Sequence, residues 1–278
     1  MRIIDNVTEL QQAINTSGGG RVGFIPTMGA IHDGHLSLMS RARAECDLVV
    51  VSIFVNPTQF NDPNDLKNYP RQEAQDCALV ESVGVDIVFV PSVGEIYPEP
   101  DNRQFDFGGV DARMEGASRP GHFNGVAQVV SRLFDIVQPT VSYFGQKDFQ
   151  QVAVIRAMVR DLSLPVEIVE VPTVRECDGL ALSSRNVLLT PEHRAAAPAI
   201  YAALSSAQSS VGAKSPNDVA SQVVSDVEQS GLLRVIYFEI SDARTLEPIT
   251  DWASSDNIQG CIAVQAGAVR LIDNIKLK

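Results

Sequence analysis

The sequence predicts an α/β protein: a doubly wound parallel sheet followed by a smaller C-terminal α+β domain. Three observations lead to this class. Apolar β-like runs alternate with helical patterns over the first two-thirds of the 278 residues. The run 47–55 is almost continuously apolar and rich in β-branched residues, which is typical of a strand buried on both faces. After about residue 175 the order changes to helices followed by strands.

The elements of the first region follow from their hydrophobic periodicity. Leu36, Met39, Ala42 and Cys46, for example, fall on one arc of a helix. The expected strands lie within 21–28, 47–55, 86–91, 141–145 and 166–172, and the expected helices within 34–46, 72–83, 126–137 and 149–159. Because strands alternate with helices, we expect right-handed crossovers and one parallel sheet covered on both faces. Ligands should bind beyond the carboxyl ends of its strands.

Capping signals organise the second region. Thr190 and Ser215 each precede a proline at the first position of an expected helix, and Pro198 should end or kink the first of these helices. Residues 205–215 are expected to form a loose surface loop. Three strand-like runs, at 235–241, 261–266 and 269–276, close the chain and favour a mainly antiparallel sheet. We therefore place the domain boundary between residues 175 and 176.

Charge and cysteine content narrow the class of protein. The net charge is −12, from 22 Lys+Arg and 34 Asp+Glu, and a surface that acidic repels nucleic acids and anionic membranes. No apolar run approaches the about 18 residues of a membrane helix, and the first residues lack a secretion-signal pattern. The four cysteines lie far apart, which indicates reduced thiols. We expect a cytoplasmic protein that binds neither nucleic acid nor membrane.

The sharpest motif is the stretch 26–35, PTMGAIHDGH, which follows a strand and enters a helix. Free N–H groups and the dipole at a helix start favour an anion such as a triphosphate, and Gly34 leaves room for a nucleotide. His32 and His35 can donate to a phosphate that gains charge as it is attacked. Two unrelated polar turn residues or a metal pair are the alternatives; the strand–turn–helix context disfavours the first, and the lack of a nearby third ligand disfavours the second.

A second motif, FVNPTQF at 54–60, directly follows the long apolar strand. Asn56 and Gln59 therefore sit where a doubly wound sheet presents its ligand groups. Their neutral amides suit hydroxyls and carboxylates without adding charge. Simple capping of the strand end by Asn-Pro is the alternative interpretation.

Three more polar stretches are candidates for ligand binding. FGQKDFQQ at 144–151 places Lys147 at a helix start, suited to phosphate, with Gln151 one turn further along. LSSRN at 182–186 combines two hydroxyls and a guanidinium as phosphate donors. RPGHFNG at 119–125 is a loop that holds an arginine and a histidine. An ordinary aspartate N-cap with an exposed lysine and a polar linker are the respective alternatives for the first two.

Together these stretches resemble one family: pantothenate synthetase, or pantoate–β-alanine ligase, a Rossmann-like member of the HIGH-type nucleotidyltransferase superfamily. PTMGAIHDGH, FVNPTQF, RPGHFNGV, FGQKDFQQ and LSSRN match its motifs in its order, from about residue 3 to the C-terminus. Leu182 stands where Met is common and Gln146 where Glu is common. The resemblance makes residues 1–175 a nucleotide- and pantoate-binding domain and residues 176–278 a lid.

The resemblance implies an ATP-dependent ligase. Pantoate attacks the α-phosphate of ATP to give pantoyl-adenylate and pyrophosphate, and the amine of β-alanine then releases AMP and pantothenate. It further implies Mg²⁺, held mainly by the phosphates, and a homodimer. Such chemistry needs positioning and charge stabilisation more than acid–base work.

The resemblance also assigns site residues. His35, His32 and Lys147 are the expected catalytic residues, Gln59 and Gln151 would bind pantoate, and Gln59 would also bind β-alanine. Asp76 is a candidate metal contact, and Tyr69, Arg119 and His122 would shape the site. The expected ATP contacts are Met28, Gly34, His35, Gly145, Lys147, Asp148, Val174, Leu182, Ser183, Ser184 and Arg185.

Three other functions are alternatives for this sequence. A cytidylyl- or adenylyltransferase of the same superfamily would stop at nucleotide transfer, but Gln59 and Gln151 argue against it. A class I aminoacyl-tRNA synthetase fragment would share the His-x-Gly-His pattern, but the acidic charge disfavours tRNA. A nucleotide sensor without turnover would not need His35, Lys147 and Arg185 together.

Overall fold

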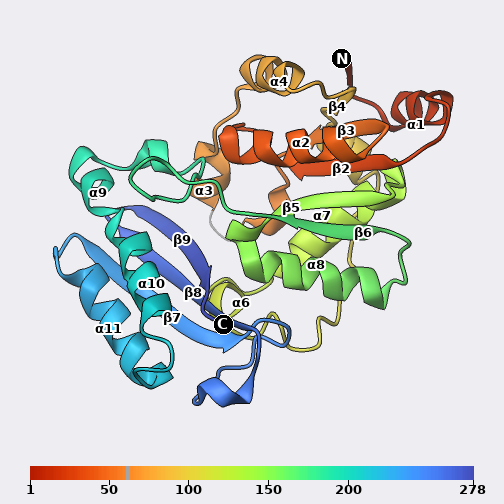
Figure 1. Ribbon diagram of the computed structural model, residues 1–278. Helices are drawn as coiled ribbons and strands as arrows, with labels where there is room; N and C mark the ends of the chain where they lie inside the picture. Colours follow the sequence, from red (N-terminus) through yellow and green to blue (C-terminus); the bar gives the residue numbers. More distant parts are fainter. Residues whose placement is uncertain (61–62) are drawn as a thin grey trace. The chain divides into compact units, whose positions relative to one another are not determined.

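The computed structural model describes residues 1–60 and 63–278, which form two compact units (Figure 1). The first unit comprises residues 1–108, 119–146 and 154–172, and the second comprises 109–118, 147–153 and 173–278. Two short segments of the expected first domain therefore belong to the second unit. The roles predicted for the two domains remain predictions.

A six-stranded parallel sheet forms the centre of the first unit, in the order β1-β4-β3-β2-β5-β6. Its strands are β1 (Arg2–Ile4), β2 (Val22–Thr27), β3 (Leu48–Ile53), β4 (Ile87–Phe89), β5 (Val141–Gly145) and β6 (Glu167–Val171). The chain runs outward from β2 to β4 and then returns to add β5 on the other side of β2. The topological switch point thus lies between β2 and β5, where a doubly wound sheet binds its ligands.

Helices cover both faces of this sheet (Figure 1). On one face, α2 (Asp33–Glu45) and α4 (Glu73–Ser82) pack on apolar residues of β2 and β3, with Met39 and Val80 fully buried. On the other face, α7 (His122–Val137) contacts β2 and α1 (Val7–Thr16), and Phe134 meets Phe24 edge to face. The remaining helices of this region are α3 (Pro63–Asn68), α5 (Val93–Ile96) and α8 (Phe149–Asp161), of which α8 spans both units.

The second unit contains an antiparallel sheet of β7 (Leu233–Asp242), β8 (Ile258–Ala266) and β9 (Val269–Lys276). Figure 1 shows α10 (Ala199–Ser209) and α11 (Pro216–Glu228) lying against this sheet. Leu204, Val223 and Ile262 are fully or almost fully buried in the core between them. Two shorter helices, α6 (Met114–Ser118) and α9 (Pro191–Ala196), complete the unit.

The predicted fold class is confirmed: a doubly wound parallel sheet and a small α+β part are both present. The helix caps at Thr190 and Ser215 are as expected, and α9 ends before Pro198. The predicted loop over 205–215 is wrong for its first half, because α10 continues to Ser209. The serines of this stretch lie on the outside of a helix whose Ala203, Leu204 and Ala207 are buried.

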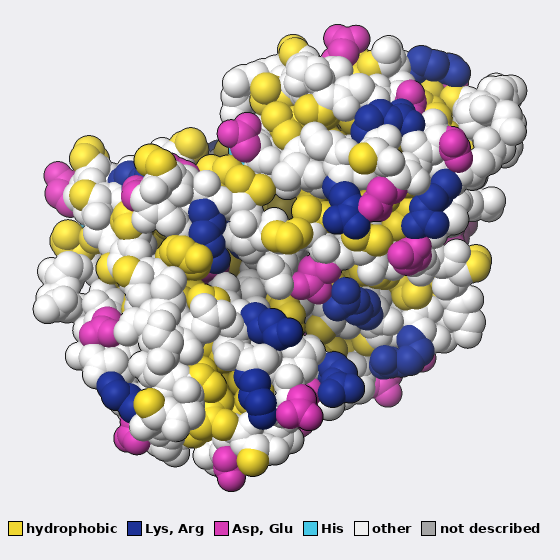
Figure 2. Space-filling view, in the orientation of Figure 1, with side chains coloured by type: hydrophobic (Ala, Val, Ile, Leu, Met, Phe, Trp, Pro, Cys, Tyr) yellow, Lys and Arg dark blue, Asp and Glu magenta, His cyan; other side chains and the backbone are white. Residues whose placement is uncertain are grey.

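Two surface observations bear on the expected partners. In the part of the chain that the structure describes, no helix is long and apolar enough to cross a membrane. On the face seen in Figure 2, Lys and Arg side chains are interspersed with Asp and Glu.

Candidate active site

The loop that leaves β2 is held by the carboxylate of Asp76, from α4. Asp76 is 2% exposed, and it accepts the backbone N–H groups of Ala30 at 2.9 Å and Ile31 at 2.8 Å, one on each oxygen. Gly29 adopts φ +80°, and a Cβ there would lie 2.8 Å from Oδ2 of Asp76. Only glycine fits this conformation at this distance. Asp76 therefore fixes the shape of the loop that delivers His32.

This arrangement competes with the metal contact predicted for Asp76, because both oxygens already accept hydrogen bonds. Among the described residues, no three His, Cys, Asp or Glu side chains gather in a way that could hold a metal ion. The metal role of Asp76 thus stays a prediction, and its observed partners point to a role in loop geometry.

His32 and His35 lie together at the start of α2. His32 is the N-cap, and its Nδ1 accepts from the N–H of Gly34 at 3.1 Å. A neutral imidazole that accepts at Nδ1 carries its proton on Nε2, where it can donate to a phosphate. The ring of His35 lies 4.1 Å from that of His32, centroid to centroid. The N–H group of Gly34, which the sequence predicted to be free for an anion, is therefore already bonded to His32.

Asn56 organises the turn that follows β3. Its side chain is 1% exposed, and its Nδ2 donates to the carbonyl of Gly125 at 3.2 Å and to Oε1 of Gln59 at 3.3 Å. The Tyr97 hydroxyl donates to Oδ1 of Asn56 at 3.1 Å, and burial raises the pKa of Tyr97, so this donor stays protonated. A Cβ on Gly125 would lie 2.4 Å from the carbonyl oxygen of Thr58, so glycine permits the close approach of α7.

Gln59 brings two of the predicted motifs into contact. Its Nε2 donates to Sδ of Met28 at 3.0 Å, which joins a residue predicted to bind pantoate to one predicted to bind ATP. The backbone carbonyl of Gln59 is held by Nδ1 of His122 at 2.8 Å, while Arg119 lies 3.2 Å from Nε2 of that ring. Arginine can only donate, so Nε2 accepts and Nδ1 carries the proton. Tyr69, 8% exposed, packs edge-on against Phe60 beside this turn.

In the second unit, Lys147 and Gln151 lie at the start of α8. Lys147 Nζ is 3.3 Å from Oδ1 of Asp148, and 18% of the Lys147 side chain is exposed. Gln151 is partly buried on the first turn. Between them, Gln150 is 5% exposed and bonds to the backbone of Glu115, Val110 and Arg113. Gln150 therefore ties segment 109–118 to this helix start.

The LSSRN stretch closes a short hairpin. The N–H of Leu182 donates to the carbonyl of Val174 at 3.0 Å, which places two predicted ATP contacts side by side. The hydroxyl of Ser183 accepts the N–H of Arg185 at 3.2 Å, so the turn presents Ser183 and Arg185 together with Ser184. Asn186 fastens the turn to the hairpin through the carbonyl of Ala181 and through Glu176.

The predicted residues fall into two sets, one in each unit. The first set contains Met28, His32, Gly34, His35, Gln59 and, at the end of β5, Gly145. The second contains Lys147, Asp148, Gln151, Val174, Leu182, Ser183, Ser184 and Arg185. In the first unit, the carboxyl ends of β3, β2 and β5 are neighbours, so the loops after them start from one edge of the sheet.

The sequence did not indicate two residues that hold the predicted site segments in place, Gln150 and Tyr97. Gln150, adjacent to the predicted Gln151, is buried, and only the doubled glutamine of the motif hints at it. Tyr97, which bonds to Asn56, carries no local signal at all. Each contact joins positions distant in the chain.

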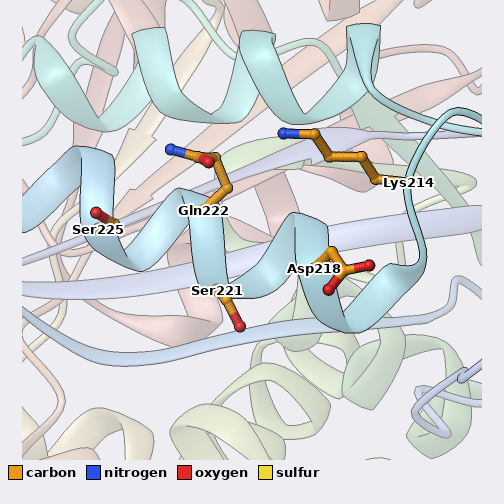
Figure 3. A pocket seen from close by; sticks show the side chains of 5 residues that line it. All are labelled: Lys214, Asp218, Ser221, Gln222 and Ser225. Carbon is orange, nitrogen blue, oxygen red and sulfur yellow. The ribbon is translucent and has the colours of Figure 1, made fainter.

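A surface depression lies elsewhere, along α11 in the second unit (Figure 3). It is lined by the polar side chains of Lys214, Asp218, Ser221, Gln222 and Ser225. None of these residues belongs to the motifs, so the depression does not compete with the two sets above.

Comparison with known proteins bears on both fold and motifs. Residues 2–276 match the family model described as pantoate–β-alanine ligase. The pantothenate synthetase of Porphyromonas gingivalis is 52% identical over 99% of both chains, and that of Phocaeicola vulgatus is 54% identical over 100% of both.

Solved structures agree with these sequence relatives. The crystal structure of pantothenate synthetase from Thermus thermophilus covers 100% of this chain and 99% of its own, with a TM-score of 0.94 and 47% identity. The pantoate–β-alanine ligase of Francisella tularensis, solved in complex with β-γ ATP and β-alanine, has a TM-score of 0.81 and 35% identity, over 100% of this chain and 98% of its own. The chain therefore belongs to the pantoate–β-alanine ligase family.

Proposed function

We propose a role for each of the two sets of residues in the reaction of this ligase. The reaction condenses pantoate with β-alanine to pantothenate through a pantoyl-adenylate, and it consumes ATP and releases AMP and pyrophosphate. The residue roles that follow are those that the family resemblance implies.

In the first step, a carboxylate oxygen of pantoate attacks the α-phosphorus of ATP, and the bond to the β-phosphate oxygen breaks. Charge builds on the phosphate oxygens, so donors arranged in advance lower the barrier. His32 and His35 donate from the start of α2, and Lys147 contributes a positive charge. Gln59 and Gln151 bind pantoate through their amides, and the other predicted ATP contacts hold the nucleotide.

In the second step, the amine of β-alanine attacks the acyl carbon and AMP leaves with the electron pair of the acyl–oxygen bond. The family resemblance assigns Gln59 to β-alanine as well as to pantoate, and the contact of Gln59 with Met28 supports a position beside the loop of the first motif. AMP is a good leaving group, so this step depends mainly on orientation. We assign β-alanine binding to Gln59 on this basis.

Three further properties remain proposals. Mg²⁺ would be bound mainly by the ATP phosphates, because the described residues offer no clustered set of three or more His, Cys, Asp or Glu ligands. The family resemblance supports a homodimer, and the wide spacing of the four cysteines supports a cytoplasmic location.

The proposed mechanism rests mainly on the hydrogen bond from Gln59 to Met28. This bond joins the loop proposed to bind the nucleotide to the side-chain amide proposed to bind pantoate. The test is exchange of labelled pyrophosphate into ATP, with enzyme, Mg²⁺ and pantoate but without β-alanine. A free-standing adenylation step is reversible, so we expect exchange that requires pantoate and does not require the amine. Exchange that appears only with β-alanine would contradict the discrete adenylate and favour concerted ligation.

Replacing Gln59 should weaken pantoate binding selectively. An unpaired buried polar group costs about 1–3 kcal/mol, so Gln59→Ala should raise the pantoate KM by roughly 5- to 150-fold. The KM for ATP should change little. Steady-state kinetics with each substrate varied in turn would measure both, with Gln104→Ala, an exposed glutamine, as the matched control. A raised ATP KM with an unchanged pantoate KM would move Gln59 to the nucleotide site.

A further inference from the structure

Asn274 is held in a fixed position on β9. Its side chain is 4% exposed, and its backbone pairs with Cys261 of β8. Its N–H donates to Oδ1 of Asp273 at 2.8 Å, and its side-chain oxygen accepts from Nε2 of Gln259 at 2.6 Å. Asp273 is itself held by the Arg175 guanidinium, at 2.6 and 3.0 Å. A side chain already ordered in this way loses little further entropy when it binds a neighbour.

The neighbour that Asn274 binds is the backbone of Lys147. Nδ2 of Asn274 donates to the carbonyl oxygen of Lys147 at 2.9 Å. Lys147 lies in a short turn, η2 (Gln146–Asp148), between the end of β5 and the start of α8. A bond to this carbonyl fixes the point from which the lysine side chain extends, while leaving the ammonium group to the ligand.

We propose that Asn274 is a positioning residue for Lys147, and that strand β9 thereby sets the place of the phosphate-binding cation. This inference rests on the proposed role of Lys147. Burying an amide costs free energy unless the amide is hydrogen-bonded, and here the bond reaches directly to the segment that carries the lysine. A small displacement of a charge-stabilising group is enough to slow a reaction strongly.

The test is a double-mutant cycle read out by pantoate-dependent pyrophosphate exchange and by calorimetric binding of ATP. Asn274→Ala and Asn274→Asp are made alone and together with Lys147→Ala. Aspartate keeps the size of the side chain and an oxygen for Gln259 but removes the donor to Lys147. Each change at Asn274, made alone, should lower exchange by roughly 10- to 100-fold and weaken ATP binding. In the Lys147→Ala background the same change should have almost no further effect, because both substitutions remove one function.

Gln265→Ala is the matched control. Gln265 lies on β8, the strand that pairs with β9, and its amide likewise donates to a backbone carbonyl, that of Gly267 at 2.9 Å. This bond does not reach the Lys147 segment. Circular dichroism and thermal unfolding verify that every variant is folded at the assay temperature. We expect near wild-type exchange in this control.

Two results would overturn the inference. Either wild-type exchange in the folded Asn274 variants, or an equal loss with and without Lys147, would show that Asn274 does not act through the lysine. Failure of the proposed function looks different: the wild-type enzyme itself would then show no pantoate-dependent exchange.

Discussion

His35→Ala slows the adenylation step by roughly 10²–10³ in rate, the usual effect of removing one donor arranged in advance for a developing charge. His35 lies in the first turn of α2, with its ring 4.1 Å from that of His32. The N-cap bond of this helix comes from His32, so loss of the His35 ring leaves the helix start intact. Rapid-quench measurement of pantoyl-adenylate in a single turnover tests the expectation.

Two comparisons make this test specific. His32→Ala removes the cap and should also lower the free energy of unfolding, by about 0.5–2 kcal/mol, whereas His35→Ala should leave stability nearly unchanged. His193→Ala, in α9 and outside the motifs, should leave adenylation at the wild-type rate. A single-turnover rate within threefold of wild type would remove His35 from the catalytic set.

Lys147→Ala nearly abolishes pyrophosphate exchange, with an expected loss of roughly 10²–10³. The ammonium group is a compact cation at a helix start, 18% of its side chain is exposed, and Asp148 lies 3.3 Å from it. Without the positive charge, the phosphates of ATP and of pyrophosphate are held less firmly, so binding and reaction should both weaken. Exchange kinetics and calorimetric binding of ATP measure the two effects separately.

Lys147→Arg distinguishes charge from geometry. Arginine keeps the charge on a longer, planar group, so an intermediate activity is expected at a site built for a point cation. Lys214→Ala removes a lysine beside α11 and should leave exchange unchanged. Full exchange in Lys147→Ala would assign the phosphates to other residues, and Arg185 would be the first to test.

The sequence alone was enough for the fold class and the motifs, because the signals involved are local. A β-branched run such as 47–55, a serine or threonine before a proline, and a glycine-containing turn at 26–35 each restrict a few consecutive residues. The stretches 26–35 and 144–151 lie between a strand and a helix, as predicted, and 54–60 follows β3. The loop predicted over 119–125 is wrong for its second half, because α7 begins at His122. Elements without a strong local pattern were missed: β1 has only three residues, and the serines after Ser205 concealed the end of α10.

The tertiary structure decided how these local pieces meet. Periodicity does not show that β5 returns to lie beside β2, which creates the switch point. Asp76 shapes the loop before His32 from a position 45 and 46 residues away, and Asn274 holds Lys147 across 127 residues. A hydrogen bond of this kind depends on the distance between two atoms, and that distance is set only once both segments pack on the same core. Local patterns therefore identified the candidate chemical groups, while long-range packing determined what holds them in place.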